Sequence, residues 1–288
     1  MSTPGLFTIA TLRVGELYIP HGETTMRDPV HVWLVRGEGV NILVDSGMPD
    51  MEWMGRVLRT KGWGGGHDAL RKVLAEEGLT PDDIDFVVPT HLHFDHGYNL
   101  DLFPNSTLVV QRDEIFHAID PTPTQRIYYP REILIELINR KRPQGLRLID
   151  GDLELVPGFQ LLKLPSHTAG MQVPIVTTSA GKAALVSDLG DHYHYWYPAD
   201  PRASRKPMRF LSDTFLAGNL RSSSENEWIA AMRRVLDHAD IVVPAHDFRI
   251  PKRMPEQWFA VPDGFDDDLS LVPPEDMDMD MALAESRK

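Results

Sequence analysis

The chain has 288 residues, of which 42% are hydrophobic and 25% are charged. This composition is typical of a globular protein with a substantial buried core. The chain contains no cysteine, which excludes disulfide bonds, a thiol nucleophile and a zinc site built from cysteine. Its formal net charge is −13 and its sequence has no basic stripe, so we expect no nucleic-acid partner.

The two ends of the chain carry further information. The start lacks a basic segment followed by an apolar one, and no stretch reaches the length of a membrane span. We therefore expect a cytoplasmic protein with no membrane partner. From Asp263 to Lys288, acids outnumber bases by nine to two, with little periodicity. This pattern predicts a folded domain over residues 1–262 and an acidic, flexible tail over residues 263–288.

The order of predicted elements indicates the fold class. The predicted strands are residues 7–19, 31–36, 40–45, 84–89, 161–165, 183–188 and 240–245. The predicted helices are residues 68–77, 131–142 and 224–238, with Gly78 as a C-cap and Ser224 as an N-cap. Residues 37–39, Gly-Glu-Gly, predict a hairpin turn. Strands and helices mixed without strict alternation fit two packed sheets with helices outside.

Residues 90–96 read Thr-His-Leu-His-Phe-Asp-His and follow an apolar run. In an extended segment, His91 and His93 point to the same side. If the chain then turns into a helix, Asp95 and His96 come to a neighbouring point in space. Imidazole and carboxylate together suit zinc, manganese, iron or cobalt. The cluster therefore predicts two half-sites for two divalent metal ions, in a catalytic centre with room for water.

Three later strand-like runs also end on ligand-type side chains. His167 follows residues 161–165, Asp188 closes residues 183–188, and His246 and Asp247 follow residues 240–245. One such ending is common in any protein. Four of them, counting residues 84–89 before the cluster, indicate strand ends that face one crevice.

These residues resemble the metallo-β-lactamase superfamily, whose hallmark is His-x-His-x-Asp-His followed by a distant His, Asp and His. The resemblance covers residues 6–258 and implies an α/β fold of the αββα sandwich type, with two mixed sheets and helices on the outer faces. It implies His91, His93 and His167 on one ion, Asp95, His96 and His246 on the other, and Asp188 bridging both. Zn²⁺ is the favoured ion. Asp45 would support the ligands without binding metal itself.

Residues 91–97, 102–105, 109–112, 165–170 and 245–247 look like the N-acyl-homoserine lactone lactonase branch of that superfamily. The resemblance implies a small-molecule ester or lactone substrate and, as in many relatives, a homodimer. Those lactonases place a tyrosine three positions after the bridging acid, where it polarises the substrate carbonyl. This chain has Asp191 there, so Tyr193 or Tyr195 would have to replace it.

Two bound ions would generate a bridging hydroxide near neutral pH and polarise the carbonyl that it attacks. The expected catalytic residues are Asp95, which passes a proton to the leaving oxygen, Asp188 and Tyr193. The aromatic run at residues 192–197 is either a packing cluster or a wall of the binding site.

Two other classes of function stay open. A thioester hydrolase of the hydroxyacylglutathione type would need cations for the glutathione carboxylates, and Arg202, Arg205 and Lys206 are the candidates. A redox iron site, or a protein that holds metal without turnover, is the third possibility. The complete set of seven ligands with a bridging acid favours the hydrolytic pair.

Overall fold

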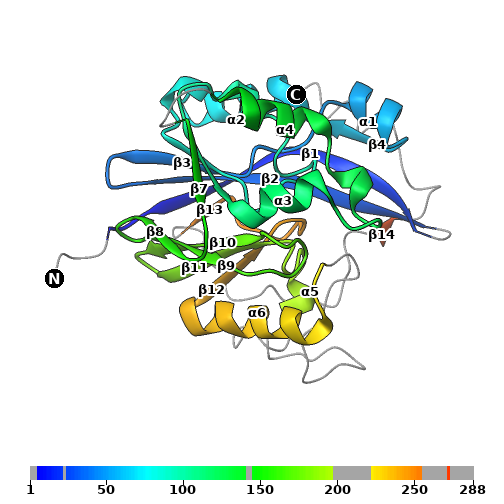
Figure 1. The fold of residues 1–288 in the computed structure, drawn as a ribbon. Helices are drawn as coiled ribbons and strands as arrows, with labels where there is room; N and C mark the ends of the chain where they lie inside the picture. Colours follow the sequence, from blue (N-terminus) through cyan, green and yellow to red (C-terminus); the bar gives the residue numbers. More distant parts are fainter. Residues whose placement is uncertain (1–4, 22–23, 141–144, 197–221, 255–270, 273–288) are drawn as a thin grey trace.

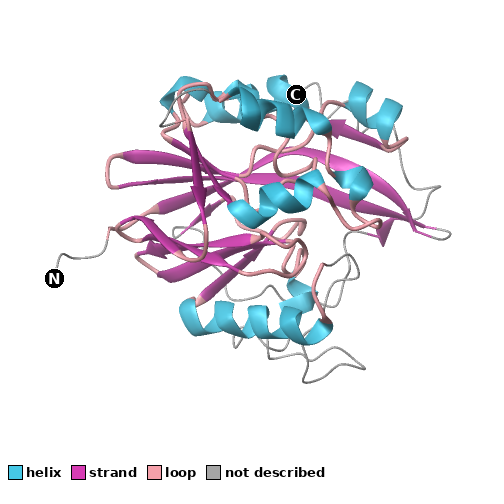
Figure 2. Ribbon diagram, viewed as in Figure 1, coloured by secondary structure: helices cyan, strands magenta, loops and turns pink. Residues whose placement is uncertain are grey.

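The computed structural model describes residues 5–21, 24–140, 145–196, 222–254 and 271–272. Two β-sheets face each other, and helices cover the outer face of each sheet (Figure 1). Coloured by secondary structure, the two sheets form the middle layers of the molecule, with helices above and below them and one helix, α3 (Arg112–Ile119), at the height between them (Figure 2). The αββα sandwich expected from the sequence is confirmed.

The first sheet has the order β13-β1-β2-β3-β5-β6-β7, with β4 paired to β1 and β14 paired to β2. Its strands are β1 (Thr8–His21), β2 (Thr24–Gly37), β3 (Val40–Val44), β4 (Lys61–Gly64), β5 (Phe86–Val88), β6 (Thr107–Gln111), β7 (Leu146–Ile149), β13 (Arg253–Met254) and β14 (Leu271–Val272). β3, β5, β6 and β7 run parallel to one another. The other pairs are antiparallel, and β1 and β2 form a long hairpin.

The second sheet has the order β12-β11-β10-β9-β8. Its strands are β8 (Leu153–Val156), β9 (Phe159–Lys163), β10 (Gln172–Thr178), β11 (Gly181–Ser187) and β12 (Ile241–Pro244). Among the described strands of this sheet, β11 and β12 are the only parallel pair. Parallel pairing brings the ends of β11 and β12 to the same edge. That edge carries two of the expected ligands.

Five of the six described α-helices lie on the two outer faces. In Figure 1, α1, α2 and α4 lie above the first sheet, and α5 and α6 lie below the second. The α-helices are α1 (Met51–Val57), α2 (Gly66–Glu76), α3 (Arg112–Ile119), α4 (Arg131–Asn139), α5 (Tyr193–Trp196) and α6 (Glu225–His238). Single 3₁₀ turns occur at Pro81–Asp83, Leu100–Leu102 and Arg126–Tyr128. Within the described ranges, no helix combines the length and apolarity needed to cross a bilayer.

Alternation along β2 explains why the first sheet is covered on both faces. Trp33 and Val35 point into the core between the two sheets, whereas Val32 and Leu34 point toward the helices above. Successive side chains of a strand face opposite sides of the sheet, so a strand that is apolar on both faces must be buried on both. A third cluster, around Trp228 of α6, covers the outer face of the second sheet.

Two of the local signals read from the sequence are confirmed, and one is shifted by a residue. Glu38 and Gly39 both have positive φ, at 52° and 75°, as a two-residue hairpin turn between β2 and β3 requires. The C-cap of α2 is Glu77, one residue before the predicted cap, and Gly78 follows it with φ of 72°. Ser224 caps α6 through a capping box with Glu227.

Two expectations are extended by the structure. β2 begins at residue 24 rather than at residue 31, because it pairs with β1 along the whole hairpin. Leu271 and Val272, inside the predicted tail, pair with β2. The rest of residues 263–288 lies outside the described residues, so the boundary at residue 262 stays a prediction.

Candidate metal centre

The expected ligands come from the ends of strands in both sheets. β5 leads into residues 90–96, β9 into His167, β11 into Asp188, and β12 into His246. The loop that carries the cluster is fixed to the end of β3, since the Ser46 N–H donates to the His96 carbonyl at 2.6 Å. Strand ends held by two packed sheets give the side chains a rigid platform.

The structure brings all seven residues together in two groups. His91, His93, His167 and Asp188 form the first group, called here the His167 group. Asp95, His96 and His246 form the second, called the His246 group. Ligand atoms within each group lie within 4.8 Å of one another. The two groups are those implied by the resemblance.

Asp188 lies between the two groups and offers one oxygen to each. Its Oδ1 is 3.2 Å from His96 Nε2 and 3.3 Å from His246 Nε2. Its Oδ2 is 3.2 Å from His167 Nε2 and 3.8 Å from His91 Nε2. This is the arrangement a bridging carboxylate needs.

The residues fit divalent metal ions. Five imidazoles and two carboxylates, with no thiolate, are the donor set that zinc and related ions accept in hydrolytic sites. His91 Nε2, His96 Nε2 and Asp188 Oδ1 are buried and make no hydrogen bond within the described structure. Buried polar atoms rarely lack a partner, so their convergence on one place points to a bound ion.

The protonation states in the metal-free chain separate the two groups. Burial and the neighbouring imidazoles lower the pKa of His91 and His93 well below 6.5, so both rings are neutral and able to bind metal. Burial opposes the charged form of His96 and His246 as well, but nearby carboxylates raise the pKa of both rings well above 6.5. A metal ion must therefore displace protons in the His246 group.

Asp45 orients His96, as the resemblance implied. Its Oδ2 accepts a hydrogen bond from His96 Nδ1 at 2.8 Å, which leaves Nε2 facing the His246 group. Its Oδ1 accepts from the Thr90 N–H at 2.6 Å and from the Thr90 hydroxyl at 3.0 Å. Asp45 directly follows β3 and has φ of 61°, a strained backbone conformation for a residue other than glycine. The hydrogen bonds to His96 and Thr90 hold it in this conformation.

Ser187 is a second strained residue beside the site, with φ of 48° immediately before Asp188. Its hydroxyl lies 2.9 Å from the Thr90 hydroxyl and 3.3 Å from His96 Nδ1. The backbone turn at Ser187 therefore delivers Asp188 to the space between the groups, and the hydroxyl ties that turn to residues 90–96.

His246 is oriented from the β2 side. Its Nδ1 donates to the Pro29 carbonyl at 2.9 Å, with Asp28 Oδ1 at 3.6 Å. Burial raises the pKa of Asp28 to about 6, against the opposing effect of His246. No local sequence pattern predicts this support, because it depends on contact with a strand more than 200 positions earlier.

Asp95, the expected proton carrier, belongs to the His246 group. Its Oδ2 is 3.7 Å from His96 Nε2 and 3.8 Å from His246 Nε2, and the residue is 9% exposed. Asp95 is thus among the more accessible members of the site.

The structure places Tyr193 in α5, 3% exposed and packed in the core between the sheets. The Arg249 guanidinium lies 5.9 Å from the centre of its ring. Asp191, in the position of the lactonase tyrosine, lies 3.3 Å from the His192 ring. The role of Tyr193 at the substrate carbonyl stays a prediction.

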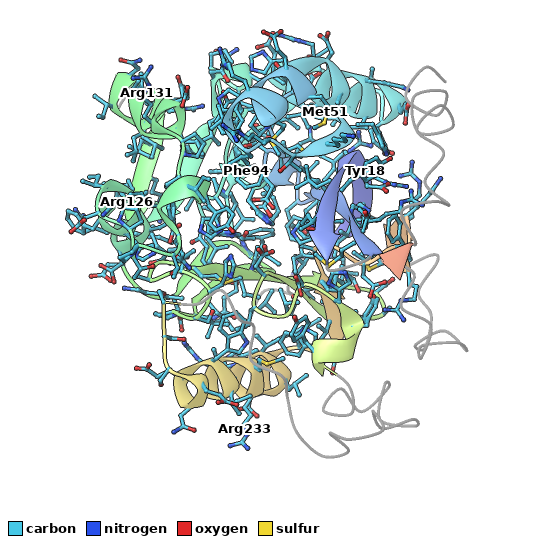
Figure 3. All side chains as sticks on the ribbon, turned by 90° about the vertical axis from the view of Figure 1, so that its right-hand side faces the viewer. Tyr18, Met51, Phe94, Arg126, Arg131 and Arg233 are labelled. Carbon is cyan, nitrogen blue, oxygen red and sulfur yellow. The ribbon has the colours of Figure 1, made fainter. Side chains whose placement is uncertain are left out.

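Aromatic rings surround His93. The Tyr129 ring lies 4.7 Å from the His93 ring and the Tyr128 ring lies 5.4 Å from it. Tyr128 stacks on Phe94, which stacks on Trp53 of α1. Phe94 lies near the centre of the molecule in Figure 3, between the layer that carries Met51 and the layer that carries Arg233.

Sequence reasoning missed two buried polar groups that tie the loops together. Glu114 of α3, fully buried, contacts the loops on both sides of the His167 group. Gln172 Nε2 donates to the carbonyls of Pro89 and Val109, linking the second sheet to the first. Arg202, Arg205 and Lys206, the cations considered for a thioester substrate, lie outside the described residues.

Comparison with known proteins places this site in a family. The model of the metallo-β-lactamase superfamily matches residues 25–246, which include the whole site. The chain belongs to this superfamily.

Curated relatives of the chain include lactonases. Over 167 residues it is 32% identical to the N-acyl homoserine lactonase AiiA of Bacillus thuringiensis subsp. kurstaki. That match covers 55% of the chain and 62% of the relative, so the chain spans less than two thirds of this protein. It is also 29% identical over 217 residues to metallo-beta-lactamase domain-containing protein 1 of Rattus norvegicus, covering 71% of the chain and 61% of that protein.

Solved structures agree on the fold. A quorum-quenching N-acyl homoserine lactone hydrolase superposes with a TM-score of 0.63 at 22% identity, covering 86% of this chain and 95% of that one. AidC, a dizinc quorum-quenching lactonase, superposes with a TM-score of 0.56 at 19% identity, covering 80% of this chain and 76% of that one. At this level of identity the similarity establishes the fold alone.

Proposed function

We propose that the chain is a hydrolase that uses two divalent metal ions to open a lactone ring of the N-acyl-homoserine type. The observation that carries the proposal is the position of Asp188, whose two oxygens face the two groups of potential ligands. A mononuclear site would need only one of these groups. The curated relatives named as N-acyl homoserine lactonases support the substrate class.

The chain's own residues would divide the work. His91, His93 and His167 would hold one ion, Asp95, His96 and His246 the other, and Asp188 both. Ions held there would activate water near neutral pH and polarise a carbonyl oxygen. The Asp45 carboxylate holds a proton on His96 Nδ1, so the proton that a metal ion would displace is the one on Nε2.

Asp95 would move the proton that the reaction transfers. Ring opening forms a bond from water oxygen to the carbonyl carbon and breaks the bond from that carbon to the ring oxygen, which must gain a proton. The place of Asp95 in the His246 group and its 9% exposure support this role. Its role matches general acid–base catalysis by a positioned carboxylate.

The test is an activity panel with zinc-reconstituted protein. N-hexanoyl and N-decanoyl homoserine lactones, a simple γ-lactone and an acylated glutathione thioester are followed by acid release at neutral pH. We expect turnover of the acyl homoserine lactones, loss of turnover on chelation, and its return with zinc. The Asp188→Asn variant, equal in size but unable to offer two anionic oxygens, serves as the matched control.

Thioester turnover without lactone turnover would replace the proposed substrate with the glutathione class. No turnover of any ester by protein carrying two ions would contradict the hydrolytic proposal itself. The cytoplasmic location and the homodimer expected from the sequence stay predictions.

A further inference from the structure

Glu114 of α3 lies outside both groups of potential ligands, yet it is 0% exposed. Its Oε1 accepts hydrogen bonds from the Leu92 N–H and the Tyr129 hydroxyl, both at 2.9 Å. Its Oε2 accepts from the Thr168 hydroxyl at 2.6 Å and from the Gly170 N–H at 3.1 Å. Four donors fill the acceptor positions of one carboxylate, which offsets the cost of burying its charge.

Three of these donors belong to the two loops of the His167 group, and the fourth, the Tyr129 hydroxyl, belongs to a residue whose ring packs against His93. Leu92 lies between His91 and His93, and Thr168 directly follows His167. One oxygen of Glu114 therefore binds the loop of the first two histidines, and the other binds the loop of the third. Glu114 therefore joins the same two loops that a metal ion bound by His91, His93 and His167 would join.

Gly170 permits this close approach. A Cβ atom at residue 170 would lie 2.0 Å from the Glu114 backbone nitrogen and 2.4 Å from Glu114 Cα, distances that real Cβ atoms do not reach. The loop can therefore lie against the start of α3 only because residue 170 has no side chain. In the same region, the Gln125 amide donates to the His167 carbonyl, and His117 lies 2.6 Å from the Gln125 oxygen.

The His246 group is held by other residues. Asp45 orients His96 and the Pro29 carbonyl orients His246, and within the described structure Glu114 makes no hydrogen bond to residues 95, 96 or 246. The rings of His96 and His246 are thus oriented by residues other than Glu114.

We propose that Glu114 is a positioning residue that sets the metal affinity of the His167 group and leaves that of the His246 group unchanged. The inference rests on the two-ion site proposed above. Glu114 fixes the His91–His93 loop relative to His167, so the three rings stay in place before an ion arrives. Preorganised ligands bind more tightly because less ordering accompanies binding.

The carboxylate cannot be replaced by an amide. Each of its oxygens accepts one backbone N–H, from Leu92 or from Gly170, and a backbone donor cannot turn away as a hydroxyl can. A glutamine at this position must direct its NH₂ group at one of the two backbone donors, whichever way the amide is placed. In Glu114→Gln, the amide NH₂ group and one backbone N–H therefore face each other as two donors. The loop that carries this backbone N–H is loosened, while the volume of the side chain hardly changes.

The experiment measures each group separately. Zinc is titrated into metal-free protein while long-range ¹H–¹⁵N spectra follow the imidazole nitrogens, which are assigned with His167→Ala and His246→Ala variants. In Glu114→Gln we expect zinc to bind the His167 group about 10- to 100-fold more weakly, the size found for residues that orient metal ligands. The affinity of the His246 group stays at the value of the parent protein and is the internal reference.

Tyr129→Phe is the matched control. It keeps the ring against His93 and both backbone hydrogen bonds to Glu114, and it removes only a rotatable hydroxyl. Its effect on the His167 group should stay below about fivefold, the worth of one ordinary hydrogen bond. Thr168→Val, which removes the 2.6 Å bond and keeps the shape, is the second test if Glu114→Gln does not fold, and it should weaken the His167 group alone.

An equal loss of affinity in both groups, or a lower melting temperature with unchanged affinity in both, would overturn the proposal. Either result would assign Glu114 a general structural role. These measurements follow metal binding and not turnover. A protein that fails to hydrolyse lactones but shows the selective loss would refute the proposed substrate and leave the role of Glu114 intact.

Discussion

The orientation of His96 by Asp45 gives a prediction that can be worked out from the structure. Asp45 Oδ2 accepts the hydrogen of His96 Nδ1 at 2.8 Å, and Oδ1 accepts from the Thr90 N–H at 2.6 Å. In Asp45→Asn the amide oxygen can serve only one of these donors. If it stays with the fixed Thr90 N–H, the NH₂ group faces His96 Nδ1–H, and two donors oppose each other.

When the His96 ring loses one of its two protons, it can relieve this conflict by keeping the remaining proton on Nε2 and not on Nδ1. That proton would lie where the His246 group converges, and it would have to leave before metal binds. Changes of this kind cost about 10- to 100-fold in metal affinity, or roughly 1.4–2.8 kcal/mol. We expect a loss of this size at the His246 group and little change at the His167 group.

Competition with a chelator, read by the imidazole spectra, measures the effect. Ser46→Ala is the matched control, since the Ser46 hydroxyl bonds the His96 carbonyl at 3.2 Å and makes no bond to the ring. An Asp45→Asn protein that binds both ions with the parent affinity would refute the reasoning. So would a loss confined to the His167 group.

Three further predictions concern catalysis, pH and stability. Asp95→Asn should retain two ions and lose turnover by at least about 100-fold; parent-level turnover would exclude proton transfer by Asp95. In the metal-free protein the pKa values of His96 and His246 are raised, so protonation of these rings stabilises the folded state. This stabilisation is full below pH 6.5 and is lost as the pH rises through the raised pKa values. Zinc affinity rises over the same range, because zinc must displace these protons. Between about pH 6.5 and 8.5, the melting temperature should fall without zinc and rise with zinc. A change in the same direction under both conditions would contradict this prediction. Ser224→Ala should cost about 1 kcal/mol and Ser223→Ala almost nothing, by thermal unfolding; equal effects would argue against the cap.

The metal-ligand types and the strands that carry them could be predicted from the sequence. Residues 90–96 combine local spacing with residue types that few other roles require, and the apolar runs before His167, Asp188 and His246 are short enough to be strands. The grouping into two sets came from the resemblance, because spacing alone does not say which strand ends meet.

The supports of the site could not be predicted in this way. Glu114 stands in an Arg-Asp-Glu start of a helix and resembles a solvent-facing charge, and its burial depends on Gly170, 56 positions later. The bond from His246 to Pro29 joins residues 217 positions apart. Such contacts follow from the packing of the two sheets, which no local pattern encodes. Asp191 could be read from the sequence as a departure, but its pairing with His192 could not.

Asp188 is proposed to bridge two ions held by the two groups. Anomalous scattering from crystals of the zinc-loaded protein locates each ion and the side chains beside it. We predict two peaks about 3.5–4 Å apart, with one Asp188 oxygen on each, His167 beside one and His246 beside the other. A single peak, or two peaks with both Asp188 oxygens on the same ion, would contradict the account.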